Sequence, residues 1–490
     1  MNSLNLDEYL YESYYFQYPI DIEVTSITFN SKEVIPNSIF VAIKGFKSDG
    51  NNYIEEAIEK GTTLIVTETL PTKEYKDVGF LIVKNARKAL AILSRILFEY
   101  PDKKLKIIGV TGTDGKTSTC FITYHLLKDL GYKVGLISTS NISVNESIIP
   151  SPYRQSTPEA PILFKLLREC ANNKIEYVVL EATSHALSSY FSRLSKIKFD
   201  CSIITTITEE HLDFHKDKAS YIKSKLKIID KLKDDGILIS TYKNPYLDRC
   251  LDKANKLNKQ YFIVEDSINY QINNLDTLSP LSVNIKKRSY ETNFYLPILI
   301  SNAMLSCLAI KKLTNIKFKK IFNKLKNIDS IKGRFNIIEN NINRTVIIDF
   351  AHTSDAFDKV FSFLTSFNKN IIALFGSGGE RDIEKRAKMG LVAAKYCSTI
   401  VLCEEDPRYE DNDKIMRDIE KGINSTNNNV HLVKINNRKE AIIKAFELSY
   451  PNDILIFLGK GHEQTIERKN IKISYDEEKT IKEVIKTLYG

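Results

Sequence analysis

A glycine-rich segment, GVTGTDGKTS (109–118), combines the residue types that bind phosphate. Glycines allow the backbone to approach a ligand closely, and N–H groups at the start of a helix attract anions. Lys116 would reach the β- and γ-phosphates, and the Thr117 hydroxyl would hold Mg²⁺. The alternative is a glycine turn between a strand and a helix that has only a structural role. The segment predicts a triphosphate site made by Gly112, Thr113, Asp114, Gly115, Lys116, Thr117 and Ser118.

Carboxylate and imidazole groups occur in two further segments. Glu181 ends an apolar run in LEATSHAL (180–187), where a ligand role is favoured over a solvated surface charge. EEHLDFH (209–215) contains two histidines and Asp213, which by composition alone could suggest zinc. The spacing fits zinc poorly, and a triphosphate site favours Mg²⁺ with oxygen ligands.

The elements that position these residues alternate between apolar strands and amphipathic helices. Strands are expected at 39–45, 62–68, 177–182 and 201–207, with helices at 53–61, 121–131 and 162–173. Alternation of this kind predicts an α/β fold with a doubly wound, mostly parallel sheet. Segment 270–300 is expected to form short strands and turns.

The third part of the chain repeats a strand-to-loop pattern. TVIIDFAH (345–352), NIIALFGSGG (370–379), TIVLCEED (399–406) and DILIFLGKGHE (453–463) each end in polar or glycine-rich residues. Ligands of open α/β sheets bind at such carboxyl ends of strands. The expected domains are residues 1–103, a central phosphate-loop domain at 104–331, and a Rossmann-like domain at 332–490.

Composition limits the broad class of protein. The 490 residues include 43% hydrophobic and 27% charged residues, a balance typical of globular proteins. No apolar run approaches a membrane span, and the N-terminus has no signal pattern, so a cytoplasmic location is expected. Seven scattered cysteines fit a reducing compartment. The net charge of +9 fits either a lysine-rich composition or attraction of nucleotides, and nucleic-acid binding is not expected because no basic block carries interleaved aromatics.

Several of these segments resemble the motifs of the Mur ligase family. GTDGKTS resembles the family's GTNGKT[ST], with Asp114 where asparagine is usual, while LEATSHAL and EEHLDFH resemble MEVSSHAL and DHLDYH. The resemblance implies that Glu181 and His211 bind Mg²⁺ together with Thr117. It also implies that Lys225, fourteen positions after His211, is carbamylated, although without the resemblance an exposed helix lysine is the expected interpretation. The implied catalytic residues are Lys116, Glu181, His211 and Lys225.

The resemblance continues through the C-terminal motifs. GRF (333–335) and DFAHTSDAF (349–357) resemble the family's GRME and DYAHTPDAL. Asn302 resembles an asparagine of a GxFNxxN segment, in which the other positions depart from the pattern. The implied nucleotide contacts from these segments are Asn302, Arg334, Asp349 and His352.

EEDPRYED (404–411) carries the information on specificity. It resembles DNPRxED, the pattern of relatives that add meso-diaminopimelate. The resemblance implies a diacid substrate, since an arginine such as Arg408 can bind a distal carboxylate with two hydrogen bonds. Glu405 and Asp406 depart from this pattern and add negative charge, so lysine, ornithine and lanthionine stay open, as does a simple surface turn. The implied amino-acid contacts are Arg381, Asp406, Pro407, Arg408, Gly459 and Glu463.

Two segments resemble the part of the family that binds a UDP-sugar peptide. FNSKEVIPNSIFVAIKGFKSDG (29–50) resembles DSRxVxPGxLFVAxxGxxxDG, with Asn30 and Lys32 replacing Asp and Arg, and QSTPEA (155–160) resembles NTTPD. The implied contacts are Ser31, Ser156, Thr157, Thr183 and Arg193.

Taken together, the chain resembles the Mur ligase family, MurE type. The resemblance implies an ATP- and Mg²⁺-dependent ligase that joins a diamino acid to UDP-N-acetylmuramoyl-L-alanyl-D-glutamate through an acyl phosphate, in peptidoglycan precursor synthesis. A monomer that does not insert into the membrane is expected. The rival interpretations are a related ligase with a non-wall substrate, such as a folylpolyglutamate synthetase, and a nucleotide switch without ligase chemistry.

Overall fold

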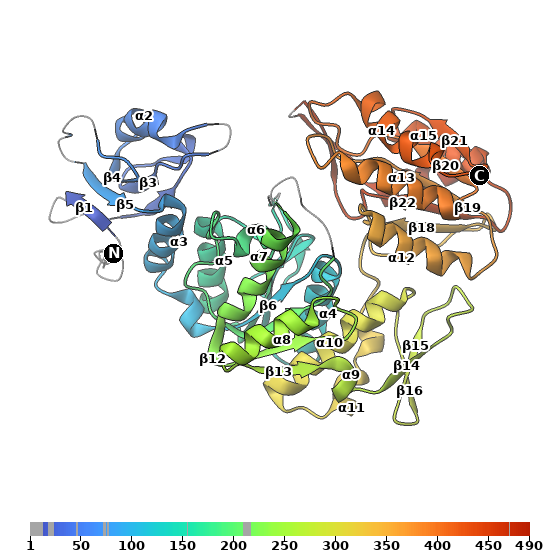
Figure 1. Ribbon diagram of the computed structural model, residues 1–490, viewed down its shortest axis with the longest axis horizontal. Coiled ribbons are helices and arrows are strands. Elements are labelled where there is room, and N and C mark those ends of the chain that lie inside the picture. Colours follow the sequence, from blue (N-terminus) through green and yellow to red (C-terminus); the bar gives the residue numbers. More distant parts are fainter. Residues whose placement is uncertain are drawn as a thin grey trace.

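The computed structural model describes residues 13–17, 24–45, 48–71, 75, 78–153, 155–208, 217–469 and 471–490. The chain forms three α/β domains, each built around a mostly parallel sheet (Figure 1). The N-terminal domain lies to the left, the central domain below, and the C-terminal domain to the right in that view. The expected fold class, with three domains and a central phosphate-loop sheet, is therefore confirmed.

The N-terminal domain contains a five-stranded sheet with the order β1-β5-β4-β3-β2. Only β1 runs antiparallel to its neighbour. Alternate strand residues enter two cores: Val41 and Val66 pack with α3, while Phe40 and Ile65 pack with α2. The elements are β1 (Ser13–Gln17), β2 (Ser26–Thr28), β3 (Ser38–Val41), α2 (Ile54–Glu59), β4 (Thr62–Thr67), β5 (Gly79–Val83) and α3 (Ala86–Leu97).

The central domain contains an eight-stranded sheet with the order β13-β12-β11-β6-β10-β7-β8-β9. The strands from β13 to β7 are parallel, and β8 and β9 add an antiparallel edge. These strands are β6 (Lys106–Thr111), β7 (Val134–Ile137), β8 (Asn141–Ser143), β9 (Ile149–Pro150), β10 (Tyr177–Glu181), β11 (Phe199–Ile204), β12 (Leu232–Ser240) and β13 (Gln260–Ile263).

Both faces of this sheet are covered, so its strands are apolar on both sides. Ile108 and Val179 face one core with α4 and α10, whereas Ile107 and Val178 face the other core with α5 and α7. The helices are α4 (Lys116–Asp129), α5 (Ala160–Asn172), α6 (Ser184–Leu187), α7 (Lys218–Asp230), α8 (Leu247–Lys256), α9 (Val264–Ser267), α10 (Pro297–Thr314) and α11 (Phe318–Phe322).

A small antiparallel sheet projects from the central domain (Figure 1). Its strands are β14 (Tyr270–Asn273), β15 (Ser282–Ile285) and β16 (Arg288–Glu291). The expected strands and turns of this segment extend only to residue 296, because Pro297 starts α10. Proline is favoured at a first helical position, where its missing N–H would have had no partner in any case.

The C-terminal domain contains a six-stranded sheet with the order β17-β18-β22-β19-β20-β21, in which only β17 is antiparallel. Helices α12 to α14 pack on one face, and α15 and α16 on the other. The strands of this sheet are β17 (Asn336–Ile338), β18 (Thr345–Asp349), β19 (Ile371–Phe375), β20 (Thr399–Leu402), β21 (His431–Lys434) and β22 (Ile454–Leu458), while β23 (Thr465–Arg468) and β24 (Ile471–Ser474) form a separate two-stranded sheet. The helices are α12 (Ser354–Thr365), α13 (Glu384–Tyr396), α14 (Asn412–Asn424), α15 (Arg438–Glu447) and α16 (Glu477–Tyr489).

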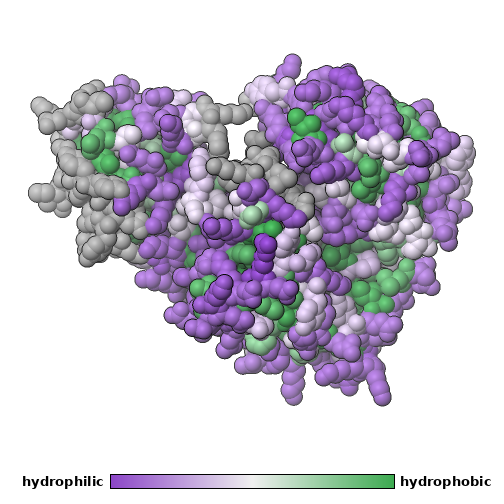
Figure 2. Space-filling model, in the orientation of Figure 1, coloured by the Kyte–Doolittle hydropathy of each residue, from purple (hydrophilic) through white to green (hydrophobic). Residues whose placement is uncertain are grey.

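The surface shown in Figure 2 is mostly hydrophilic, and it is hollowed between the N-terminal and C-terminal domains. No helix in the described part of the chain combines the length and apolar character that a membrane crossing requires. All seven cysteines are buried and free.

Candidate active site

The glycine-rich loop follows β6, the strand that lies between β10 and β11 in the central sheet. Gly112 has φ +155°, and a Cβ there would overlap the Thr205 hydroxyl. Gly115 has φ +82°, and a Cβ there would lie 2.7 Å from Asn302 Oδ1. The loop therefore requires glycine at both positions, and Gly115 directly precedes the first turn of α4.

Hydrogen bonds fix the loop against neighbouring strands and helices. The Thr113 amide donates to the Thr206 carbonyl oxygen at 2.6 Å, and the Thr113 hydroxyl lies 3.0 Å from the Tyr221 hydroxyl. Lys116 Nζ donates to the Thr113 carbonyl oxygen at 2.6 Å, which keeps the ammonium group at the loop. These contacts leave a preformed turn at the start of a helix, where an anion is favoured.

Two buried side chains with oxygen atoms, Thr117 and Glu181, meet beside the loop. The Thr117 hydroxyl donates to Glu181 Oε2 at 3.0 Å, and the Thr139 amide donates to the same oxygen at 3.0 Å. The parallel register of β10 with β6, which pairs Glu181 with Val110, brings the carboxylate to the loop. Thr117 is 5% exposed and Glu181 1% exposed.

This pair fits Mg²⁺, which prefers oxygen ligands and retains phosphate and water in its coordination shell. The expected third ligand, His211, lies outside the described residues, as do Asp213 and His215. No group of three acidic, histidine or cysteine side chains that could hold a metal occurs within the described residues. The fit therefore rests on Thr117 and Glu181.

Lys225 reaches the same loop from α7. Its Nζ donates to the Gly112 carbonyl oxygen and lies 4.6 Å from the Tyr221 ring centroid. The side chain is buried, with 1% exposure. The alternative of an exposed helix lysine, which was expected only without the family resemblance, is therefore wrong, and Lys225 lies beside the phosphate loop.

The C-terminal domain places Arg334 and Asp349 close to the loop. Asp349 accepts hydrogen bonds from the Phe335 and Ala351 amides, both at 2.6 Å, and so fixes the turn that carries Arg334. The Arg334 guanidinium lies 4.6 Å from the centre of the Phe350 ring. His352 Nδ1 lies 3.0 Å from the Phe350 carbonyl oxygen.

Arg334 connects the phosphate loop with the third domain electrostatically. Burial lowers the pKa of Arg334, and the carboxylates of Asp349, Glu181, Asp114 and Glu463 oppose that shift. The turn that carries Arg334 also packs against the 459–463 segment, because a Cβ at Gly333 would lie 2.4 Å from the His462 amide nitrogen.

The expected amino-acid contacts lie on three segments, 376–381, 404–410 and 459–463, and the region where these segments meet is the candidate acceptor pocket, called the acceptor pocket below. The Gly379 amide donates to the Asp406 carbonyl oxygen at 2.9 Å, and a Cβ at Gly379 would overlap the Pro407 carbonyl oxygen. A Cβ at Gly378 would lie 3.6 Å from both Arg381 Cγ and Arg408 Nη1. The two expected carboxylate-binding arginines thus flank the same glycine.

Arg408 already has internal partners. Its Nη1 donates to the Gly379 carbonyl oxygen, and its Nε donates to Glu467 Oε2 at 3.3 Å. A carboxylate ligand of Arg408 would therefore join an existing network.

Lys460 joins two of the expected acidic contacts and was missed by the sequence interpretation. Its Nζ donates to Asp406 Oδ1 at 3.0 Å and to Glu463 Oε2 at 2.7 Å, and its side chain is fully buried. Burial alone would lower the pKa of Lys460, but Glu463 and Asp406 raise it above its ordinary value. Gly459 has φ +94°, and a Cβ there would lie 2.6 Å from Glu405 Oε2, so Glu405 also faces this segment.

Four of the expected UDP-substrate residues surround the Glu181 loop. The Thr157 hydroxyl donates to the Glu181 carbonyl oxygen at 2.7 Å, and the Thr183 amide donates to the Thr157 hydroxyl at 3.1 Å. The Ser156 hydroxyl accepts from the Thr139 hydroxyl at 2.7 Å. Arg193 donates to the Thr157 carbonyl oxygen at 3.1 Å and to Glu159 Oε1 at 2.5 Å.

Ser31 is the expected contact from the N-terminal domain. It lies in a short 3₁₀ helix, Ser31–Glu33, where its hydroxyl donates to Glu56 Oε2 at 2.9 Å. The Asn30 side chain accepts from the Lys32 amide at the start of that helix. Asn30 and Lys32, the two residues that differ from the family pattern, therefore form a cap at the start of this 3₁₀ helix.

Four further residues contact the candidate site, and the sequence did not single them out: Thr139 binds Glu181, Lys359 binds Asp114, Lys460 binds Asp406, and Arg386 binds Glu410 and the Gly378 carbonyl oxygen. Lys460 could have been found from the lysine of GKGHE, and Arg386 from the GERDIEKR segment. Thr139 and Lys359 have no local signal, because their partners Glu181 and Asp114 are distant in the chain.

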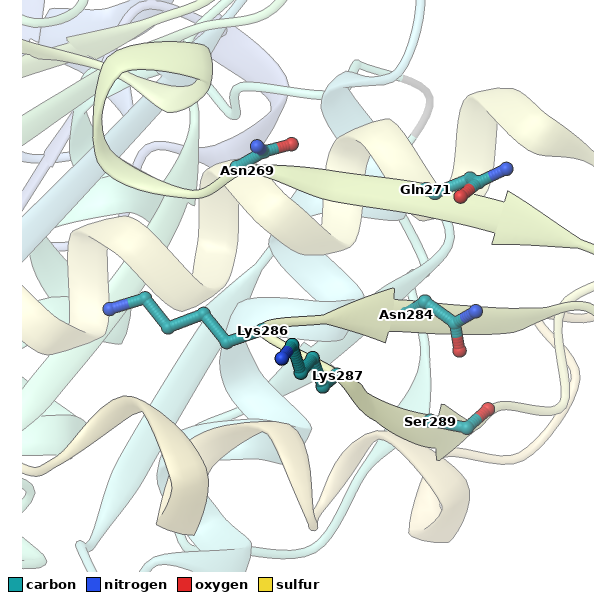
Figure 3. Close-up of a pocket in the computed structure, with 6 residues that line it drawn as sticks. All are labelled: Asn269, Gln271, Asn284, Lys286, Lys287 and Ser289. Atoms are coloured by element: carbon teal, nitrogen blue, oxygen red, sulfur yellow. The ribbon is translucent and has the colours of Figure 1, made fainter.

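A polar concavity elsewhere contains none of these residues. It lies on the β14–β16 sheet, where the labelled side chains project from the strands and their turn (Figure 3). Its lining consists of Asn269, Gln271, Asn284, Lys286, Lys287 and Ser289.

Three stretches of the chain match descriptions of known families. Residues 23–96 match "Mur ligase family, catalytic domain", residues 110–310 match "Mur ligase middle domain", and residues 333–461 match "Mur ligase, glutamate ligase domain". Each match lies within one of the three expected domains, whose boundaries stay a prediction.

Similar proteins cover nearly the whole chain. A UDP-N-acetylmuramyl-tripeptide synthetase of Borreliella burgdorferi is 36% identical over 96% of this chain and 94% of its own length. A UDP-N-acetylmuramoyl-L-alanyl-D-glutamate–2,6-diaminopimelate ligase of Clostridium tetani is 34% identical over 96% of both chains.

A solved structure extends the likeness to the fold. A UDP-N-acetylmuramoyl-L-alanyl-D-glutamate–2,6-diaminopimelate ligase superposes with a TM-score of 0.62 at 22% identity, covering 95% of this chain and 96% of the other. The three family matches, together with relatives of at least 34% identity over nearly the whole chain, show that the chain belongs to the Mur ligase family of ATP-dependent amide ligases.

Proposed function

We propose that this ligase joins a diamino acid to UDP-N-acetylmuramoyl-L-alanyl-D-glutamate, giving the UDP-linked tripeptide, ADP and phosphate. The observation that carries the proposal is that the phosphate loop, with the Thr117–Glu181 pair beside it, is joined by the 3.1 Å Asp114–Lys359 ion pair to the domain that contains the acceptor pocket. The full-length similarity to two curated ligases of this reaction supports the choice of substrate.

The reaction requires an activated carboxylate. A carboxylate oxygen of the glutamyl residue attacks the γ-phosphorus of ATP, and ADP leaves. The amine of the incoming amino acid then attacks the acyl carbon, loses a proton, and displaces phosphate that carries the former carboxylate oxygen. Lys116 and the loop amides would stabilise charge on the transferring phosphoryl group.

Thr117, Glu181 and His211 would hold Mg²⁺ in this proposal. When bound, Mg²⁺ supplies neutralisation of phosphate charge. Asn302, Arg334, Asp349 and His352 would contact or support the nucleotide, because Asn302 touches the loop and Asp349 fixes the turn of Arg334.

The proposed carbamylation of Lys225 has a structural basis. The side chain is buried beside the Gly112 carbonyl group, and an aromatic ring covers its ammonium group. Addition of CO₂ to the neutral amine, with loss of a proton, would place a carboxylate-like group near the metal ligands. Incubation with ¹³C-labelled CO₂ should give a carbamate NMR signal that is absent from Lys225→Ala.

The proposed amino acid is meso-diaminopimelate. Arg381 and Arg408 flank Gly378 and offer positive charge to carboxylates, while Asp406 and Glu463 offer negative charge to an amino group. Lysine, ornithine and lanthionine are the competing substrates.

The UDP-linked dipeptide would contact Ser156, Thr157, Thr183 and Arg193, with Ser31 on the uridine side. A cytoplasmic monomer without nucleic-acid or membrane partners is part of the proposal, since ATP and nucleotide-linked precursors are cytoplasmic metabolites.

The purified protein should form product only when all three substrates are present. The assay combines the UDP-dipeptide and ATP with each of the four amino acids, and mass spectrometry identifies the product. A tripeptide with diaminopimelate as the best substrate is the expected result. Phosphate release insensitive to both co-substrates would instead support a nucleotide switch, and product from a non-wall acceptor alone would support a related ligase.

A further inference from the structure

An ion pair connects the phosphate loop with the C-terminal domain. Lys359 Nζ lies 3.1 Å from Asp114 Oδ2, although the two residues are 245 positions apart in the chain. Lys359 also donates to Asp355, one turn earlier in α12. Two carboxylates from two domains therefore share one ammonium group.

The backbone around each partner fixes this geometry. The Asp114 carbonyl oxygen accepts from the Thr205 hydroxyl at 2.6 Å, and residue 114 forms an isolated bridge with Thr206. Helix α12 is capped by the Thr353 hydroxyl and buries Phe357 and Phe361. In Figure 1, α12 lies along the edge of its domain that faces the central domain.

Asp114 sits in the turn that leads into the first helical position, Lys116, so a bound triphosphate would lie close to its carboxylate. The negative charges of the carboxylate and the triphosphate would repel each other, which would lower the affinity for the triphosphate. Burial alone would raise the pKa of Asp114, but the Lys359 charge, a hydrogen bond with Asp355 and the Lys116 charge together lower it below its ordinary value. The carboxylate is therefore held as an anion whose charge is opposed mainly from the other domain.

We propose that Lys359 is a positioning residue for ATP, which offsets the Asp114 carboxylate and so couples triphosphate binding to docking of the C-terminal domain on the phosphate loop. The inference rests on the ATP binding of the proposed function. When the domains separate, Asp114 loses this partner and disfavours the triphosphate. By linkage, the triphosphate favours the docked arrangement by the same factor.

A double-mutant cycle tests the coupling. The four proteins are the unchanged chain, Lys359→Met, Asp114→Asn and the double variant. Calorimetry measures the Kd of a non-hydrolysable ATP analogue with Mg²⁺ for each. Lys359→Met should weaken binding by about tenfold, which corresponds to about 1.4 kcal/mol. In the Asp114→Asn background the same change should weaken binding less than about twofold, because no carboxylate then requires a partner.

Two outcomes would overturn the inference. Equal weakening in both backgrounds would mean that Lys359 contacts the nucleotide directly, and no weakening in either would mean that the pair does not affect ATP. Lys395→Met, which removes a 60% exposed lysine on the neighbouring helix α13, controls for general loss of charge. Lys359→Arg should restore most of the affinity.

Binding is measured without the other substrates, so failure of the coupling is distinguishable from failure of the proposed ligation. If the chain binds the analogue but the effects of the two substitutions on Kd are additive, only the coupling is contradicted. If the chain shows the coupling but makes no tripeptide, only the proposed reaction is contradicted.

Discussion

Arg386 is a fully buried cation that holds the acceptor pocket together. It binds both oxygens of Glu410, at 2.8 and 2.7 Å, and Asp418 at 3.2 Å. Glu410 in turn accepts from the Glu380 amide at 3.1 Å. The side chain of Arg386 is 0% exposed, and those of Glu410 and Asp418 are 15% and 10% exposed. The network therefore links the 376–381 and 404–410 segments.

Arg386→Met would leave two mostly buried carboxylates without this cation. Removing one partner of a buried ion pair costs about 3–5 kcal/mol, because the remaining charge stays desolvated. The matched control, Lys395→Met, removes an exposed partner of Asp358 and should cost below about 1 kcal/mol. Urea denaturation at neutral pH measures both free energies of unfolding.

The same change should act selectively on substrate binding. Loosening of the two segments would displace Arg381 and Arg408, the expected carboxylate contacts of the amino acid, and so weaken binding of that substrate; a displacement of about 1 Å can also cost on the order of a hundredfold in rate. The KM for the amino acid should therefore rise much more than the KM for ATP. If Arg386→Met is too unstable to assay, Glu410→Gln should shift the same KM in the same direction. A stability loss no larger than that of Lys395→Met, or equal increases in both KM values, would refute this reasoning.

Four further predictions follow from the site. Glu181→Gln, which keeps the shape and the Thr139 contact, should lower kcat at least about a hundredfold and raise the Mg²⁺ concentration needed for half activity; unchanged Mg²⁺ dependence would contradict the metal role. Arg408→Ala should raise the KM for diaminopimelate by about tenfold or more while leaving the KM for lysine nearly unchanged, with the 59% exposed Arg417→Ala as control. Thr157→Val removes the hydroxyl that binds the Glu181 carbonyl group and should raise the KM for the UDP-dipeptide; an effect confined to the amino acid would argue against that placement. Hydrogen bonding to Arg386 lowers the pKa of Glu410 from 4.5 to about 2. The stability that the ionised Glu410 contributes is therefore complete above pH 4.5 and is lost as the pH falls towards 2. Denaturation curves should show that Glu410→Gln loses less stability than the unchanged chain over this acid range.

Local signals in the sequence were sufficient for the centre of the site. A strand, a glycine loop and a helix are contiguous at 106–129, so the phosphate loop could be predicted without knowledge of the fold. Glu181 followed from its position at the end of a buried strand, because the ends of parallel strands meet at one edge. The alternation of strands and helices likewise predicted the α/β architecture.

Contacts between distant segments could not be predicted in this way. The Asp114–Lys359 pair depends on how two domains are docked, and neither residue type alone indicates the other. The bridging position of Lys460 depends on the convergence of two strand ends, and the contact of Arg408 with Glu467 depends on the position of β23. Such pairings are decided by tertiary packing, which the spacing along one chain does not reveal.

The central claim is that a carboxylate of the UDP-linked dipeptide receives the γ-phosphoryl group of ATP before the amine attacks. The direct test uses UDP-dipeptide with ¹⁸O in its glutamyl carboxylates, together with ATP and the amino acid in ordinary water. Mass spectrometry of the released phosphate should find one ¹⁸O for each tripeptide formed, because the leaving phosphate keeps the carboxylate oxygen. Unlabelled phosphate alongside tripeptide formation would contradict the acyl-phosphate route.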